Sequence, residues 1–220
     1  MLSRSLAISS QVARGHVGLS AIVPALQRLG HEVLAVPTIV LSNHPGHARV
    51  AGTRIPPETI EAMVDALGAN GWLAGLDLVL TGYLPSAAHV AAAARAVVAV
   101  KAASPGAQVL CDPVMGDDPK GLYIAEDAAV AIRDTLLPLA DLATPNRFEL
   151  SWLSSRPVAG IAEAIAAAES MPPPSIVVTS VPAAPEIANV LATPSLRAVC
   201  AVRSEEHTSE LQSQFRISYA

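Results

Sequence analysis

Three carboxylates lie close together in the segment CDPVMGDD, which continues a short apolar run. Asp112 comes first, and Asp117 and Asp118 follow within the same predicted loop. Mg²⁺ prefers oxygen ligands and usually takes one or two carboxylates together with nucleotide phosphates. The spacing therefore suggests a loop that holds Mg²⁺ and ATP. A structural role is an equal alternative, in which Asp112 bonds to the next turn and the other two carboxylates are solvated.

A hydroxyl, an amide and a carboxylate occur together in TPNRFEL, residues 144–150. Thr144 and Asn146 precede a predicted helix that begins near Arg147, and Glu149 falls in its first turn. Such side chains satisfy the free N–H groups of a helix start and favour its positive end. Taken alone, this segment indicates helix capping more strongly than ligand binding.

The segment SNHPGH, residues 42–47, places two imidazoles and an amide at the end of a predicted strand. Neutral histidine both donates and accepts hydrogen bonds, so His44 and His47 suit a small polar ring. A zinc site is disfavoured because no cysteine or carboxylate is near.

The segment GHVG, residues 15–18, lacks the GxGxxG spacing and a Walker lysine, so it indicates only a tight turn.

Short apolar runs alternate with longer amphipathic ones, which is typical of a mostly parallel sheet covered by helices. We therefore predict the α/β class and a three-layer α/β/α sandwich. The predicted strands are residues 5–9, 33–41, 76–80, 108–111, 141–143 and 175–178, with strand-like character again at 197–202. The predicted helices are residues 19–29, 87–102, 125–137, 148–153 and 160–169, with another starting near Pro57.

Ligands of open α/β sheets bind outside the carboxyl ends of the strands. The residues that follow the predicted strands are polar and partly acidic, and we expect them to share one edge of the sheet. They are Ser10, Ser42, Asn43, His44, Gly82, Tyr83, Asp112, Asn146, Glu149 and Thr179.

Composition argues against several classes of protein. The net charge is −5 and no Lys/Arg cluster is present, so nucleic acid is not an expected partner. The most apolar long stretch, residues 87–100, contains His89 and Arg95 and is too short for a bilayer, so no membrane span is predicted. The opening residues do not fit a secretory signal. Two isolated cysteines, Cys111 and Cys200, favour a reducing cytoplasm.

The character of the sequence changes at Arg203. The segment RSEEHTSELQS is polar, lacks strand alternation and directly follows the strand-like residues 197–202. It resembles the translation of a sequencing adaptor. We therefore divide the chain into a domain at residues 1–202, incomplete at its C-terminus, and a non-native tail at residues 203–220. An ordinary C-terminal tail is the alternative.

Residues 6–202 resemble the pyridoxal kinases of the ribokinase-like superfamily. The resemblance rests on ISSQVARGHVG, TIVLSNHPGH, LTGYLPS, VLCDPVMGDD, GLYIAED and ADLATPNRFEL. CDPVMG and TPNxxE are similar to segments of hydroxymethylpyrimidine kinases too, so these two alone do not decide the substrate. The SNH loop and GYLPS favour pyridoxal. The implied fold is the ribokinase-like α/β/α sandwich.

The resemblance implies transfer of the ATP γ-phosphoryl group to the 5′-hydroxymethyl group of pyridoxal, pyridoxine or pyridoxamine in vitamin B6 salvage. It implies a substrate site made by Ser10, His44, Pro45, Gly46 and Tyr83. On the nucleotide side it implies Asp112, Asp117, Tyr123, Thr144, Glu149 and Thr179, with Asp112, Asp117 and Glu149 serving Mg²⁺. Thr144 and Thr179 match positions that resemble a K⁺ contact in some members. A homodimer is expected for the intact protein.

The sequence departs from this family in two places. Pro45 and Gly46 stand where many relatives have polar side chains, which leaves the preference among B6 vitamers open. The GxGD segment, which supplies the family's anion hole and catalytic base, is not found. We therefore expect this chain to be essentially inactive and assign no catalytic residue. A hydroxymethylpyrimidine kinase, another small-molecule kinase of the superfamily or a non-catalytic vitamer-binding module are the alternatives.

Overall fold

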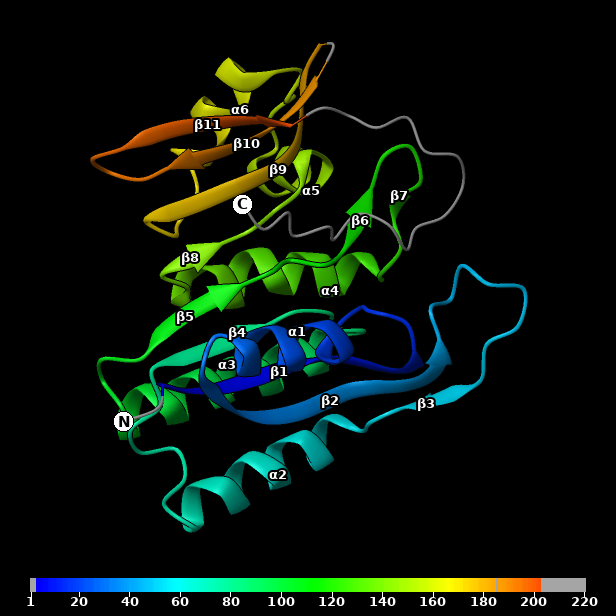
Figure 1. Cartoon of the computed structure of the whole chain (residues 1–220), viewed down its shortest axis with the longest axis vertical. Helices are drawn as coiled ribbons and strands as arrows, with labels where there is room; N and C mark the ends of the chain where they lie inside the picture. Colours follow the sequence, from blue (N-terminus) through cyan, green and yellow to red (C-terminus); the bar gives the residue numbers. More distant parts are fainter. Residues whose placement is uncertain (1–2, 185, 203–220) are drawn as a thin grey trace.

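A nine-stranded sheet forms the centre of the computed structural model, which describes residues 3–184 and 186–202 (Figure 1). Its strands are β1 (Ser3–Arg14), β2 (His31–Asn43), β3 (Gly52–Arg54), β4 (Leu78–Thr81), β5 (Gln108–Cys111), β8 (Leu142–Ala143), β9 (Ser175–Ala183), β10 (Glu186–Ala192) and β11 (Arg197–Val202). Their order across the sheet is β11-β10-β9-β8-β5-β4-β1-β2-β3. The six central strands, β9, β8, β5, β4, β1 and β2, pair with one another in parallel. At the two edges of the sheet, β3, β10 and β11 pair antiparallel to their neighbours. The predicted mostly parallel sheet is confirmed.

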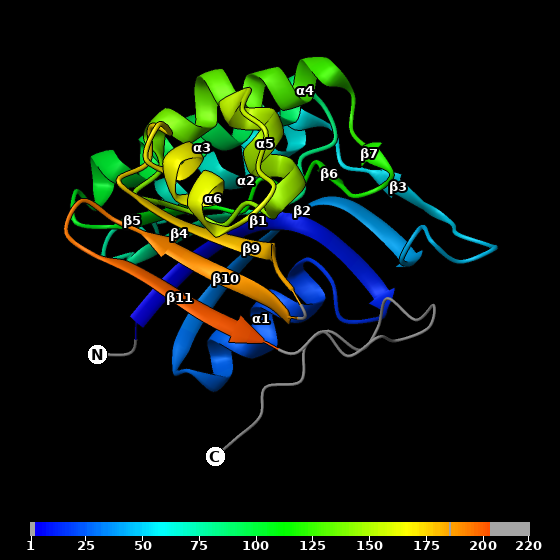
Figure 2. The same cartoon turned by 90° about the horizontal axis from the view of Figure 1, so that it is seen from above.

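Helices lie on both faces of the sheet, as a three-layer sandwich requires. They are α1 (Leu19–Arg28), α2 (Pro57–Ala69), α3 (Ala87–Ala103), α4 (Glu126–Ala131), α5 (Arg147–Ser154) and α6 (Ile161–Ala168). Figure 2 shows α2 to α6 together on one face and α1 on the other. Helix α1 packs on β1 and β2, whereas α6 packs on β9 and β10. The two faces of the sheet are therefore covered unequally by the described helices.

Local sequence signals explain several of the helix boundaries. The side chain of Ser86 accepts a hydrogen bond from the backbone of His89, which caps the start of α3 as predicted. Gly30 follows α1 with a φ of +86°, a left-handed conformation that favours glycine. Pro57 occupies the first turn of α2, where its missing N–H group costs nothing.

The structure differs from the predicted secondary structure in a few places. The helix expected over residues 125–137 ends at Ala131 and continues as a wider π-type turn, Ile132–Leu136, followed by a tight turn, Leu137–Leu139. Pro138 has no N–H group, so a regular helix could not continue through it. Strand β2 runs without a break through Pro37, with a shift in register beyond it. Strands β3 and β10 were not predicted.

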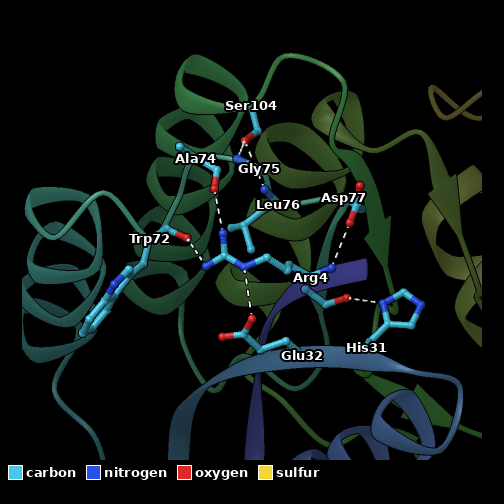
Figure 3. A network of polar contacts seen from close by, with 10 residues as sticks. Arg4, His31, Glu32, Trp72, Ala74, Gly75, Leu76, Asp77 and Ser104 are labelled. Carbon is cyan, nitrogen blue, oxygen red and sulfur yellow. Dashed lines mark hydrogen bonds and ion pairs between the residues drawn. The ribbon is translucent and has the colours of Figure 1, made fainter. Parts of the chain in front are cut away.

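The amino ends of β1, β2 and β4 are joined by a polar network around Arg4 (Figure 3). The backbone nitrogen of Arg4 donates to Asp77 at 2.8 Å, and its guanidinium donates to the carbonyl oxygens of Ala74 and Trp72. The same guanidinium pairs with Glu32 at 3.3 Å. These bonds fix the strands at the end of the sheet opposite to the candidate site.

None of the described helices is both long and apolar enough to cross a membrane. The predicted tail, residues 203–220, lies outside the described residues.

Candidate functional site

Ser10 lies within β1, not after it, because β1 continues to Arg14. Its backbone and hydroxyl face Gly18, where an added Cβ would lie 2.2 Å from the Ser10 carbonyl oxygen and 2.3 Å from its Oγ. Gly18 also has a φ of +55° and immediately precedes α1. The GHVG turn therefore brings the start of α1 against Ser10, which only glycine permits.

The SNHPGH loop is organised by its own side chains. Asn43 donates to the carbonyl oxygens of His44 and Arg49 at 3.1 and 3.0 Å, and Nδ1 of His44 accepts from the Gly46 N–H at 3.0 Å. Partial burial, and then the positive charges of His47 and Lys120, lower the pKa of His44. His44 is thus held neutral near the loop that carries Lys120, while Pro45 and Gly46 are exposed.

Asp112 directly follows β5 and is bonded to the residue that follows β8. The Thr144 hydroxyl donates to Oδ1 of Asp112 at 3.2 Å. Burial raises the pKa of Asp112 to about 6, and the Thr144 bond opposes that shift. One strand further, Asn146 pairs with Thr179, whose N–H donates to the Pro145 carbonyl at 3.0 Å. Asp112, Thr144 and Thr179 therefore lie along one edge of the sheet.

Glu149 is buried, with 3% of its surface exposed, and both of its oxygens accept from backbone N–H groups. Oε1 accepts from Met115 and Gly116 at 3.0 and 3.4 Å, and Oε2 accepts from Asn146 at 2.8 Å. Asn146 in turn accepts from the Glu149 N–H, which completes a capping box. The predicted capping is confirmed, and it also links TPNRFEL to CDPVMGDD.

The loop after β5 folds into a small hairpin of β6 (Gly116–Asp117) and β7 (Gly121–Leu122), which was not predicted. A Cβ on Gly116 would lie 2.3 Å from the Phe148 ring, so glycine allows the hairpin to pack on α5. Arg147 of α5 forms an ion pair with Asp118. The two motifs are therefore packed as one unit.

Acidic and phenolic groups gather around this hairpin. Tyr123 is 48% exposed, and burial of its hydroxyl, followed by the charges of Glu149, Asp117 and Asp112, raises its pKa. Burial likewise raises the pKa of Glu149 to about 8, against the effect of its backbone bonds. Oδ1 of Asp117 is buried and has no hydrogen-bond partner among the described residues. A buried oxygen without a partner lowers stability unless a cation or a hydrogen-bond donor binds to it.

No group of three histidine, cysteine or carboxylate side chains within residues 3–184 and 186–202 is arranged to hold a metal ion alone. Since both Glu149 oxygens already accept hydrogen bonds, the predicted metal role of Glu149 stays a prediction. Asp112 and the unpartnered Asp117 fit Mg²⁺ better, because that ion commonly completes its shell with phosphate oxygens and water.

Comparison with known proteins places this geometry in a family. The sequence profile described as phosphomethylpyrimidine kinase matches residues 13–193. The chain belongs to this family. Among solved structures, the pyridoxal kinase from Leishmania donovani in complex with ADP and pyridoxamine is 34% identical with a TM-score of 0.88, and the alignment covers 94% of this chain and 76% of that one. The pyridoxal kinase from Entamoeba histolytica is 28% identical with a TM-score of 0.87, covering 95% and 77%.

Comparison with curated relatives gives the same picture. The pyridoxal kinase PdxY of Corynebacterium diphtheriae is 40% identical over 179 residues, which are 80% of this chain and 63% of that protein. The pyridoxine/pyridoxal/pyridoxamine kinase of Bordetella bronchiseptica is 42% identical over 166 residues, 76% of this chain and 59% of that protein. The chain thus spans about three-fifths of the length of these two relatives. The predicted resemblance to pyridoxal kinases is confirmed.

Sequence analysis missed three contributors to this site. Ser9 and Thr38 are buried hydroxyls whose partners belong to the Tyr83 segment. Both hydroxyls lie within predicted buried strands, and a buried polar side chain needs a hydrogen-bond partner. The sequence therefore indicated that Ser9 and Thr38 have partners. Lys120, which acts on His44, carried no recognisable signal in the sequence.

Proposed function

We propose that this chain forms the B6- and nucleotide-binding part of an ATP-dependent kinase that phosphorylates the 5′-hydroxymethyl group of pyridoxal, pyridoxine or pyridoxamine. The observation that carries the proposal is the packing of the CDPVMGDD hairpin on the TPNRFEL helix, beside Tyr123 and on the sheet edge that also carries Tyr83. The similarity to the Leishmania pyridoxal kinase with ADP and pyridoxamine supports it.

On the substrate side, Ser10 and the His44 loop would bind the polar substituents of the pyridine ring, and Tyr83 would pack against the ring. A neutral His44 accepts or donates one hydrogen bond without adding charge, which suits an uncharged ring substituent. Pro45 and Gly46 would line the loop through their backbone.

On the nucleotide side, Asp112 and Asp117 would hold Mg²⁺, which neutralises the charge of the phosphates during transfer. Thr144, Thr179 and Tyr123 would contact the nucleotide, with K⁺ as a further ligand of the two threonines. Glu149 would keep the loop in place through its three backbone bonds. The ADP complexes of the Leishmania enzyme support this assignment.

Phosphoryl transfer depends on positioning and on charge stabilisation. The 220-residue sequence contains no GxGD segment. We therefore expect it to bind ligands without efficient turnover, since a base alone contributes about 10²–10⁴-fold. The test compares pyridoxal phosphate formation by this chain and by a version fused to the remaining C-terminal part of a close relative. Equal and robust turnover by both would refute the expected inactivity, and no pyridoxine binding by either would refute the proposed function.

A second candidate is a hydroxymethylpyrimidine kinase, because the matching family profile is described as phosphomethylpyrimidine kinase. Parallel assays of the fused protein with pyridoxal and hydroxymethylpyrimidine decide between the two. Tight pyridoxal binding without any ATP consumption would favour a non-catalytic vitamer-binding module.

We further propose that the intact protein is a cytoplasmic homodimer. The use of ATP and the unpaired thiols of Cys111 and Cys200 fit a reducing compartment. Light scattering after gel filtration tests the dimer, and fractionation of cells tests the location.

A further inference from the structure

The backbone of Tyr83 is held on both sides by buried side-chain hydroxyls from neighbouring strands. Its N–H donates to Oγ of Ser9 at 3.1 Å, and its carbonyl accepts from Oγ1 of Thr38 at 2.8 Å. Ser9 is 2% exposed and Thr38 is 0% exposed. We call Ser9 and Thr38 the Tyr83 clamp.

The strand that carries Thr38 is distorted at this position. Ser9 pairs with Pro37, but Gln11 pairs with Val40, so β2 has one more residue than β1 between these pairs. Such a bulge redirects a side chain, and bulges are over-represented beside active sites. Pro37 has no N–H group to donate to the neighbouring strand, so a bulge at this position loses no hydrogen bond from it. The bulge therefore places the Thr38 hydroxyl where it reaches the Tyr83 carbonyl.

The residue before Tyr83 is adapted to the clamp. A Cβ on Gly82 would lie 2.4 Å from the Ser9 hydroxyl, so Ser9 can approach only because residue 82 has no side chain. The Gly82 N–H donates to the Ile8 carbonyl at 2.9 Å. The N–H groups of Gly82 and Tyr83 are thus both bonded to β1.

The far end of the same segment is anchored separately. His89 is buried and bonds to the Ser86 hydroxyl at 2.7 Å and to the Ile55 carbonyl at 2.8 Å. Residues 82–86 are therefore fixed at both ends, and only the Tyr83 ring is partly exposed between them. Since backbone dihedrals set the direction of Cβ and limit the allowed side-chain rotamers, this arrangement restricts where the ring can point.

We propose that Ser9 and Thr38 are positioning residues that hold the Tyr83 ring in the orientation needed to stack on the pyridine ring of a B6 vitamer. The proposal rests on the proposed function, and it adds two residues that contact no ligand themselves. Loss of either hydroxyl leaves one Tyr83 backbone group without a partner and lets the ring turn. Binding of the vitamer should weaken, while binding of nucleotide at the hairpin should not.

The test titrates the 220-residue chain with pyridoxine and, separately, with MgADP by calorimetry. We expect Ser9→Ala and Thr38→Val each to weaken pyridoxine binding by about 3- to 10-fold, as the loss of one hydrogen bond predicts. MgADP affinity should change by less than about 2-fold, within the error of such differences. Thr38→Ser keeps the hydroxyl and should retain pyridoxine affinity.

Ser5→Ala is the matched control, because Ser5 is a fully buried serine of the same strand whose hydroxyl bonds to His31 at 2.8 Å, at the other end of the sheet. It should lower stability without changing either affinity. Unchanged pyridoxine affinity in both clamp variants, or equal weakening of both ligands, overturns the proposal while the proposed function stands. Absence of pyridoxine binding by both the unmodified chain and the fused protein overturns the proposed function and the clamp's role with it. Hydrogen exchange at the Tyr83 N–H should accelerate in Ser9→Ala, and an unchanged rate would also overturn the clamp.

Discussion

The Oε1 atom of Glu149 lies 3.0 Å from the backbone nitrogen of Met115, 34 residues earlier in the chain. This bond connects the two motifs that sequence analysis had interpreted separately, a metal-binding loop and a helix cap. A carboxylate at the third position of a helix usually bonds only to the N-cap residue. Here the second oxygen is used to hold a neighbouring loop, so the cap and the site depend on one side chain.

Replacing Glu149 tests this connection. Glu149→Ala leaves the Met115, Gly116 and Asn146 N–H groups without their acceptor. It should cost at least about 3 kcal/mol of unfolding free energy, since each buried N–H group without a partner costs about 1–3 kcal/mol. Glu149→Gln keeps one acceptor oxygen and should lose less. Urea unfolding measures both. Glu126→Ala, an exposed acid in the first turn of α4, should cost under about 1 kcal/mol, and an equal loss there would contradict the prediction.

The raised pKa of Asp112 makes stability depend on pH. Its folded pKa of about 6 exceeds the ordinary 3.8, so between these values the folded state binds more protons than the unfolded state. Stability contributed by this group is therefore present below pH 4, falls as pH rises to 6 and is constant above. The loss is at most about 3 kcal/mol, at 1.36 kcal/mol for each pH unit.

Asp112→Asn removes this dependence. Between pH 4 and pH 6, the unfolding free energy of the unmodified chain should fall relative to that of Asp112→Asn. A difference between the two proteins that is independent of pH would refute the raised pKa of Asp112. Thr144→Val should move the divergence to higher pH, because the Thr144 bond stabilises the ionised carboxylate.

Gly18 and Gly30 offer a matched test of close packing against Ser10. Both have positive φ, so alanine costs about 1 kcal/mol at either position through backbone strain. At Gly30 an added Cβ meets nothing within 4 Å, whereas at Gly18 it would meet the Ser10 carbonyl and hydroxyl. We expect Gly18→Ala to unfold at a clearly lower urea concentration than Gly30→Ala. It should also weaken pyridoxine binding, which Gly30→Ala should not, and identical behaviour of the two variants would count against the Ser10 contact.

Sequence patterns predicted the strands and helices whose apolar residues recur regularly. They missed the elements that depend on contacts with residues distant in the sequence. Gln108–Cys111 was predicted to the residue, because a short apolar run ends at a charged residue. The hairpin of Gly116–Asp117 and Gly121–Leu122 has no apolar pattern, and its close packing on Phe148 requires glycine at position 116. Its position is a tertiary effect that no local signal encodes.

The candidate site was predicted mainly from the family resemblance. Spacing suggested a site only for Asp112, whereas Thr144 and Glu149 were assigned to it by the resemblance, and the structure brings all three to one edge of the sheet. The bond between the two motifs could not be predicted, because the local pattern of TPNRFEL indicates only a helix cap, and it is the fold that brings Oε1 of Glu149 to the Met115 N–H. Ser9 and Thr38 were missed because a hydroxyl in an apolar strand shows that a partner exists without showing which.

The unequal covering of the sheet yields a last prediction. On the face that carries α1, a row of partly exposed apolar side chains crosses the strands beyond β1, formed by Leu80, Leu110, Leu142, Val177 and Leu191. Parallel sheets normally have both faces covered. We therefore expect this face to bind apolar dyes and to promote self-association of the chain at high concentration.

Two adjacent valines of β9 distinguish exposure of this face from disruption of the core. Val177 lies on the partly exposed face, and Val178 is fully buried on the other. Val177→Thr should reduce dye fluorescence and aggregation with little change in stability. Val178→Thr puts the same hydroxyl into the core and should cost about 1–3 kcal/mol, because burying an unpartnered hydroxyl is unfavourable. Dye titration and light scattering, with urea unfolding of both variants, measure the difference. If Val177→Thr destabilises the chain as much as Val178→Thr, the two faces are equally buried and the row is part of a closed core.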